Sequence, residues 1–194
     1  MNKVDEMSAI NIGSTLFRFR DYTPIPLILL LLLVSQPTVL TATLGLVMIF
    51  FGELIRIYSV AFIGSISRTR KGSLGDKLIK EGPFAYVRNP LYVGNFFISF
   101  GVSVFSGNIY LMFLTAALFA FQYFYIVSYE ESLLSDKFGS EFDDYRREVP
   151  AWFPIRSFKL DAIAWPDSFS GALRSEKKTL LAILGVVTAL ILAS

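Results

Sequence analysis

The residues best suited to chemistry lie in one short stretch and in a pair of acids that follows it. The stretch runs from Gly82 to Gly94 and reads GPFAYVRNPLYVG, and the acids are Glu130 and Glu131. No charged side chain lies between Arg88 and Glu130. An uncharged run of this length is too long for one bilayer crossing and fits two crossings of roughly 20 residues each, so its ends should return to the same membrane face. The two polar clusters are therefore predicted to meet there.

This meeting point could bind a ligand that carries both an anionic group and hydroxyl groups. A helix that begins at Pro90 would offer free backbone N–H groups and the positive end of its dipole to a carboxylate or a phosphate. Glu130 and Glu131 could hold a cation, an amine or ribose hydroxyls. The residues leave one alternative open, a structural ion pair between Arg88 and one of the two acids.

The composition defines the class of protein. Hydrophobic residues make up 54% of the 194 residues, and the mean hydropathy of +0.55 exceeds that of ordinary soluble domains. The chain has no cysteine and no histidine, which excludes disulfides and removes the commonest general base and transition-metal ligand, so no metal site is expected. A net charge of +2 gives no reason to expect a nucleic acid as partner, and the sequence leaves the oligomeric state open.

Five apolar segments are predicted after a polar stretch, Met1–Arg20. Pro37 lies in a breaker group between the first two segments, and residues 106–108 form a tight turn between the third and fourth. The expected segments are Tyr22–Ser35, Thr38–Gly64, Pro90–Phe105, Ile109–Ser128 and Thr179–Ser194. We therefore expect an all-α, polytopic integral membrane protein that forms a single domain over residues 1–194.

Basic residues cluster in two stretches between these segments, at residues 65–89 and 135–178. Cytoplasmic loops carry an excess of lysine and arginine, so both stretches are expected on the cytoplasmic side of the bilayer. Five crossings then leave the amino terminus in the cytoplasm and the carboxyl terminus outside, in the cell membrane if the source is prokaryotic.

The second segment contains two ionisable residues, Glu53 and Arg56, on one helical face. Ionisable groups at membrane depth are expensive and are often functional. The alternative is a mutual ion pair, or snorkelling toward the nearby cytoplasmic interface.

Two motifs resemble those of a known family. GPFAYVRNPLYVG is similar to the signature G-x-[YF]-x-x-[VT]-R-H-P-x-Y-x-G of isoprenylcysteine carboxyl methyltransferases and related membrane phospholipid methyltransferases. The later stretch EESLLSDKFGSEFDDYRREVPAWFP, Glu130–Pro154, resembles the family's E-E-x-x-L-x-x-x-F-G-x-x-[YF]-x-x-Y-x-x-x-V-P-x-x-x-P. The resemblance covers roughly Leu74–Pro154, and the predicted membrane layout agrees with it.

The resemblance implies an enzyme that uses S-adenosyl-L-methionine, bound at the cytoplasmic ends of the third and fourth segments, within a core of about residues 66–154. Carried over position by position, the implied cofactor-binding residues are Lys77, Leu78, Ile79, Phe84, Asn89, Pro90, Leu91, Tyr92 and Glu130. No catalytic residue is assigned, and Arg88 and Glu131 are candidates for positioning the reactants.

The sequence departs from the family pattern at two places. Asn89 stands where the family usually has histidine, and asparagine cannot act as a base near neutral pH. Tyr125 and Ile126 stand where eukaryotic prenylcysteine members carry an arginine suited to a substrate carboxylate.

The expected reaction is methyl transfer to a lipophilic acceptor. A carboxylate is already ionised at neutral pH and needs no base, which favours carboxyl O-methylation of a prenylated cysteine or a similar amphiphile. The acceptor is expected to enter sideways from the bilayer, while the tail around Arg146–Pro154 closes over the cofactor. The alternatives are N-methylation of a phospholipid amine head group, an NADPH-dependent membrane reductase of similar fold, and an inactive membrane scaffold.

Overall fold

The computed structural model describes residues 3–63, 77–154, 164–166 and 169–193, and these residues form helices and no strands. The helices are α1 (Lys3–Phe19), α2 (Ile25–Val34), α3 (Val39–Ile63), α4 (Pro90–Phe105), α5 (Ile109–Phe138), α6 (Ser140–Glu148) and α7 (Ser170–Ala193), with a 3₁₀ helix η2 (Gly82–Ala85) before α4. The all-α prediction is confirmed for this part of the chain.

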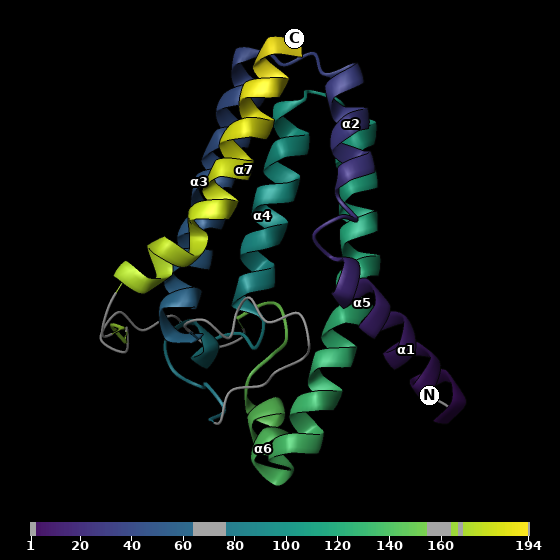
Figure 1. Cartoon of the computed structure of the whole chain (residues 1–194), viewed down its shortest axis with the longest axis vertical. Coiled ribbons are helices and arrows are strands. Elements are labelled where there is room, and N and C mark those ends of the chain that lie inside the picture. The colour runs from purple at the N-terminus through teal and green to yellow at the C-terminus, as the bar shows by residue number, and fades with distance from the viewer. Residues whose placement is uncertain (1–2, 64–76, 155–163, 167–168, 194) are drawn as a thin grey trace.

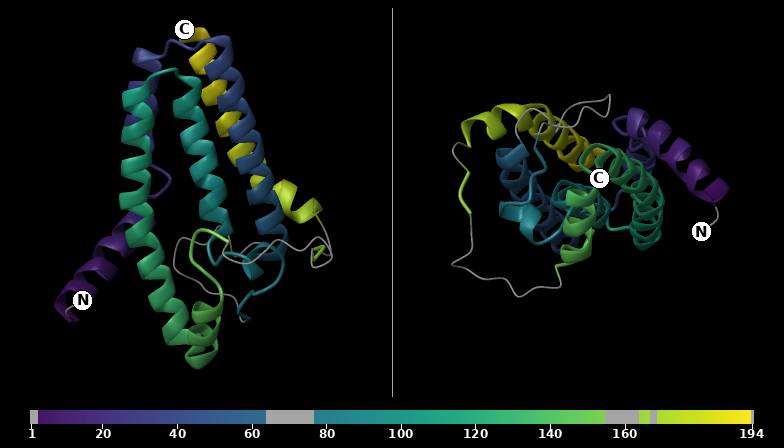
Figure 2. Two further views of the ribbon diagram at one scale, coloured as in Figure 1. Left: turned by 180° about the vertical axis from the view of Figure 1, so that it is seen from behind. Right: turned by 90° about the horizontal axis from the view of Figure 1, so that it is seen from below.

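Five of the helices, α2, α3, α4, α5 and α7, run lengthwise through the molecule, and α1, η2 and α6 gather toward one end (Figures 1 and 2). Of the lengthwise helices, α3 and α5 are long and apolar enough to cross a membrane, whereas α2 and α4 are shorter apolar helices. Large apolar side chains such as Phe50, Phe113 and Leu184 are 59%, 70% and 63% exposed on the outer surface of the bundle. An outer surface of this kind is suited to lipid contact.

The two predicted turns lie at the same end of the bundle. The helix α2 ends at Val34 before the breaker group, and Asn108 caps α5 by accepting hydrogen bonds from the N–H groups of Tyr110 and Leu111 at 3.0 and 3.3 Å. The Gln36 N–H donates to the Ser106 carbonyl oxygen at 2.9 Å, so the turns are joined directly. The carboxyl end of α7 lies at this end as well (Figure 1).

The closest packing in the bundle lies between α3 and α4, where glycines face each other. A Cβ atom added at Gly94 would lie 2.7 Å from the Gly52 carbonyl oxygen, and one added at Gly101 would lie 2.8 Å from that of Gly45. Because no larger residue fits, the two backbones are in direct contact. This contact fixes the position of the first turn of α4, which carries several predicted site residues.

The helix bounds correct the sequence expectation in three places. Residues 3–19 form the helix α1, which was expected only as a polar stretch. Its Gly13 and Phe17 pack against α5, where a Cβ atom on Gly13 would meet the Tyr125 carbonyl oxygen at 2.2 Å. The helix α5 continues to Phe138, ten residues past the predicted Ser128, until Gly139 with φ of +53° ends it. The helix α7 begins at Ser170 rather than Thr179.

Candidate active site at the ends of α4 and α5

The start of α4 and the lower half of α5 are joined by a hydrogen bond between predicted site residues. Tyr92 Oη donates to Glu130 Oε2 at 2.6 Å. Tyr92 is only 9% exposed, so its ring is packed inside the bundle and does not face lipid. Among the described residues no donor lies within hydrogen-bonding distance of Glu130 Oε1, which leaves this oxygen available to a ligand.

Arg88 forms the structural ion pair that the sequence left open. Its Nε and Nη2 atoms donate to Glu131 Oε1 at 2.9 and 2.7 Å. Its Nη1 atom donates to the carbonyl oxygens of Arg146, at 3.1 Å, and Val149. With these partners the guanidinium connects α5, the end of α6 and the segment after it, so Arg88 positions the tail over the site.

The segment that follows α6 lies across the start of α4. The Arg88 N–H donates to the Pro150 carbonyl oxygen at 2.9 Å, and Asn89 Nδ2 donates to the Ala151 carbonyl oxygen at 3.2 Å. The residue that replaces the family histidine therefore holds the tail through its amide nitrogen. Its amide oxygen remains a possible acceptor for a ligand.

Tyr145 on α6 also connects this part of the chain to the residues before α4. Its buried hydroxyl donates to the Phe84 carbonyl oxygen at 2.7 Å, next to the Gly-Pro turn. Burial raises the pKa of Tyr145 above its ordinary value, and Glu131 adds to this effect while Arg88 opposes it. The phenol therefore stays protonated and remains a donor.

The other predicted cofactor residues divide by burial. Leu78 is buried in a cluster with Phe142, Tyr145 and Val149, and Phe84 is 8% exposed. Pro90 is fully buried, whereas Ile79 and Leu91 are half-buried. Lys77 has a 76% exposed side chain that pairs with Glu81 at 3.4 Å. The contacts of Leu78 and Phe84 are thus with α6 and its tail, and Lys77 lies at the exposed edge of the site rather than beside Glu130.

A second polar network lies deeper between the helices. Arg56 Nη2 donates to Glu176 Oε2 at 2.7 Å, and Arg56 Nε lies 3.6 Å from Glu53 Oε2. Arg56 Nη1 also donates to Asn95 Oδ1, and Asn95 Nδ2 donates to Tyr123 Oη at 2.9 Å. The mutual ion pair of Glu53 and Arg56, which the sequence left open as an alternative, is therefore present, and it belongs to a network that joins α3, α4, α5 and α7.

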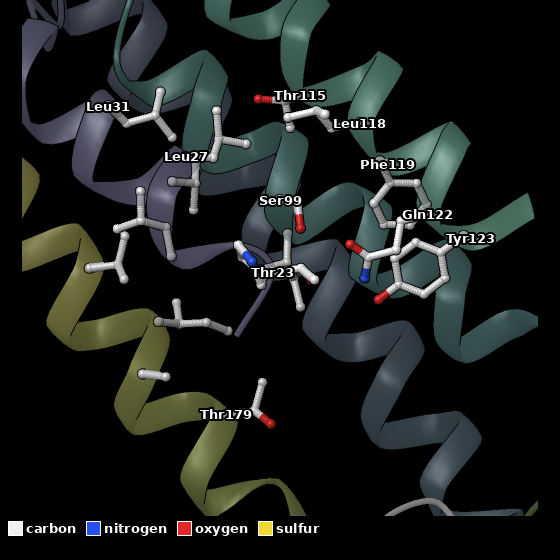
Figure 3. Close-up of a pocket in the computed structure, with 17 residues that line it drawn as sticks. Thr23, Leu27, Leu31, Ser99, Thr115, Leu118, Phe119, Gln122, Tyr123 and Thr179 are labelled. Atoms are coloured by element: carbon white, nitrogen blue, oxygen red, sulfur yellow. The ribbon is translucent and has the colours of Figure 1, made fainter. Parts of the chain in front are cut away.

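An apolar pocket of about 250 Å³ opens beside this network, with walls from α2, α4, α5 and α7. Leu27, Leu31 and Leu118 line one end (Figure 3). Polar side chains, Thr23, Gln122, Tyr123 and Thr179, lie toward the other end (Figure 3). The Tyr123 ring lies 4.7 Å from the Tyr92 ring, so the polar end of the pocket adjoins the residue that binds Glu130.

Sequence reasoning missed Asn95, Tyr123 and Glu176, and also Arg20, which lies close enough to Glu130 to interact with it electrostatically. Asn95 was detectable, since it lies one helical turn after Leu91 and is polar within an apolar helix. Glu176 carried no signal, because its partner Arg56 is 120 residues away in the chain.

The chain is similar to known proteins over this same region. A family model described as phospholipid methyltransferase matches residues 40–141. The nickel-cobalt-cadmium resistance protein NccN of Alcaligenes xylosoxydans xylosoxydans is 33% identical over 112 residues, 58% of this chain and 49% of that protein. The protein-S-isoprenylcysteine O-methyltransferase of Mus musculus is 33% identical over 133 residues, 66% of this chain and 46% of that enzyme. The chain thus spans about half the length of the curated relatives it matches.

Proposed function

The chain belongs to the phospholipid methyltransferase family, and we propose that it transfers a methyl group from S-adenosyl-L-methionine to a lipophilic acceptor. One observation carries this proposal: a polar site around Glu130 and an apolar pocket meet at the paired rings of Tyr92 and Tyr123. A water-soluble methyl donor and a membrane-borne acceptor need these two environments side by side.

The residues present fit the methyl donor. Glu130 Oε1 and the amide oxygen of Asn89 can accept hydrogen bonds from hydroxyl or ammonium groups. The start of α4 offers a carboxylate less than the sequence suggested, because Pro90 has no N–H and the N–H groups of Tyr92 and Val93 donate to the Asn89 carbonyl oxygen at 3.0 and 3.1 Å. A carboxylate there would be stabilised by the positive end of the helix dipole. When bound there, S-adenosyl-L-methionine would supply an electrophilic methyl group on its sulfonium sulfur. Glu130, Asn89, Leu91 and Tyr92 are the residues proposed to hold it, with Lys77, Leu78, Ile79, Phe84 and Pro90 shaping the edge and floor of the site.

The tail over the site is proposed to limit access of water. Arg88, Asn89 and Tyr145 hold residues 149–151 and the Gly-Pro turn together. Closure excludes water, which could otherwise compete for the methyl group. Arg88 and Glu131 have a positioning role in this account, because their side chains are only 11% and 16% exposed and are occupied by each other.

The pocket supports an acceptor with an apolar chain. An engineered apolar cavity of about 150 Å³ is large enough for benzene, and this pocket of about 250 Å³ is larger. Its walls come from helices whose outer faces are apolar, so an acceptor could enter sideways without leaving the bilayer. Withdrawal of a chain into water would cost about 0.8 kcal/mol for each CH₂ group.

A carboxylate is the favoured acceptor group, because it is ionised at neutral pH and the chain has no histidine to remove a proton. Two relatives' names point the same way, since the enzymes of Mus musculus and Schizosaccharomyces pombe are both named protein-S-isoprenylcysteine O-methyltransferase. The second candidate is N-methylation of a phospholipid amine, which the description of the matching family favours.

The test is methyl transfer from labelled S-adenosyl-L-methionine to prenylcysteine and phospholipid acceptors, with the purified protein in bilayers. We expect label in the prenylcysteine ester. Label in the phospholipid head group would support the second candidate. No transfer to either class, together with stabilisation by NADPH rather than S-adenosylhomocysteine, would support a reductase instead.

A further inference from the structure

We propose that the hydroxyl of Tyr123 donates a hydrogen bond to the carboxylate of the methyl acceptor, and that Arg56 and Asn95 fix the direction of this donor. The inference rests on the proposed function and narrows its substrate to acceptors with an anionic head. It concerns a residue that lies outside both family motifs and is buried at the polar end of the pocket (Figure 3).

The direction of the hydrogen-bond chain follows from the chemistry of arginine. A guanidinium has only donors, so the Asn95 atom that contacts Arg56 must be the amide oxygen. The amide nitrogen then faces Tyr123 and donates to its Oη atom at 2.9 Å. Arg56 therefore donates to Asn95, and Asn95 donates to Tyr123.

The hydroxyl hydrogen of Tyr123 is not used in the bond with Asn95, in which the tyrosine oxygen is the acceptor. Tyr123 is only 8% exposed, and no described residue accepts a hydrogen bond from its hydroxyl. Buried tyrosine hydroxyls usually have a partner. Since Tyr123 lines the pocket, a ligand in the pocket is well placed to supply the acceptor atom.

Arg56, the first donor in this series of hydrogen bonds, is held in place by two carboxylates. Arg56 is bound by Glu176, which is 1% exposed, and lies beside Glu53, which is 6% exposed. One guanidinium and two carboxylates give these three side chains a formal charge of −1, so they do not attract an anion by charge, and what they contribute at the pocket is the directed hydroxyl donor of Tyr123. A directed donor favours a carboxylate over an ammonium head, because an ammonium group has only donors.

The position of Tyr123 also sets the orientation of the acceptor. Its ring stacks on Phe119 at 4.1 Å and contacts Tyr92 at 4.7 Å, so the hydroxyl is at the end of the pocket nearest the proposed cofactor site. A carboxylate bound there would place its apolar chain along Leu27, Leu31 and Leu118. The head group then lies at the side where the methyl donor is expected.

Two variants and one control test the inference in the full-length protein in bilayers. Tyr123→Phe removes the donor and keeps the ring. Asn95→Asp turns the donor away, because a carboxylate accepts from both Arg56 and the tyrosine. Tyr110→Phe is the matched control, since Tyr110 lies on the same helix and is 79% exposed at its far end. The acceptors are a prenylated cysteine with a free carboxylate and a chain-matched amine.

We expect Tyr123→Phe to raise the KM for the carboxylate acceptor roughly ten-fold to hundred-fold, the range for loss of a hydrogen bond to a charged group. The preference for carboxylate over amine should fall by the same factor. Asn95→Asp should act in the same direction. Calorimetric affinity for S-adenosylhomocysteine should stay near the wild-type value in both, and Tyr110→Phe should change neither quantity.

Three results would overturn the inference. An unchanged KM and acceptor preference in Tyr123→Phe, while the wild type methylates the carboxylate, would remove Tyr123 from recognition and leave the proposed function intact. Equal losses of activity, cofactor affinity and thermal stability in Tyr123→Phe would make its role structural. Absence of transfer to any chain-bearing acceptor by the wild type would refute the proposed function itself, and this inference with it.

Discussion

Tyr92 on the first turn of α4 donates a 2.6 Å hydrogen bond to Glu130 on α5, across 38 residues of chain. The tyrosine ring packs against Tyr123, and within the described part of the chain no donor reaches the other carboxylate oxygen of Glu130. This pair is the point at which the polar site, the apolar pocket and the family motifs meet.

Replacement of Glu130 by glutamine should weaken binding of S-adenosylhomocysteine roughly ten-fold to hundred-fold, since a hydrogen bond to a charged group contributes about 1.5–3 kcal/mol. Isothermal titration calorimetry measures this directly. Glu141→Gln is the matched control, because Glu141 has a 55% exposed side chain and pairs with Lys80. Equal affinity in the wild type and Glu130→Gln would exclude Glu130 from the cofactor site.

Arg88→Ala should lower the thermal stability of the protein more than any exposed charge deletion. It leaves the Glu131 carboxylate and the Val149 carbonyl oxygen without their shared donor in a largely buried place, a defect that typically costs about 3–5 kcal/mol. Arg147→Ala serves as control, because Arg147 has a 76% exposed side chain and pairs only at the surface with Asp144. Equal melting temperatures for the two variants would contradict the positioning role of Arg88.

Because the pKa of the Tyr145 hydroxyl is raised, we expect the free energy of unfolding to depend on pH in the alkaline range. Its folded-state pKa is raised above the usual value of about 10, so its contribution is present below about pH 10 and is lost as the pH rises toward the folded-state pKa. The free energy of unfolding should therefore fall more steeply between about pH 9 and pH 12 in the wild type than in Tyr145→Phe. Parallel curves from chemical denaturation of the two proteins would show that the Tyr145 proton does not matter to the fold.

Single cysteines can test the predicted sides of the membrane, because the chain has none of its own. Gln36 and Ser140 are exposed at opposite ends of the bundle. In intact cells an impermeant thiol reagent should label Gln36→Cys and leave Ser140→Cys unlabelled until the cells are opened. Labelling of both variants in intact cells would contradict a cytoplasmic site.

The local signals in the sequence were sufficient for most of the fold. Pro37 and residues 106–108 end helices where expected, and Pro90 begins one, because proline and small polar residues act on their immediate neighbours. The helix α1 was missed because its burial depends on contacts of Gly13 and Phe17 with α5, more than 100 residues later. That the bundle crosses the membrane five times is still a prediction, since among the described residues α3 and α5 are the helices found with the length and composition for a span.

The site residues that belong to the two motifs could be predicted from the sequence. Those that meet through packing of the helices could not. Tyr92, Glu130, Arg88 and Glu131 lie together as their spacing predicted. The roles of Asn95, Tyr123 and Glu176 follow from the way α3, α4, α5 and α7 face one another, which no short-range pattern in the sequence records. Lys77 is implied as a site residue by the family resemblance alone, and its exposed pairing with Glu81 leaves that assignment a proposal.

In the proposed reaction the apolar pocket receives the chain of the acceptor while Glu130 holds the methyl donor. The most direct measurement is the KM of carboxylate acceptors with increasing chain length, in bilayers, for the wild type and for Ala182→Phe, which narrows the pocket from α7. We predict that KM falls with chain length in the wild type, and that Ala182→Phe abolishes this gain for long chains while Thr188→Phe, on the exposed face of α7, preserves it. Methylation of an acceptor without any apolar chain as efficiently as a prenylated one would contradict the account.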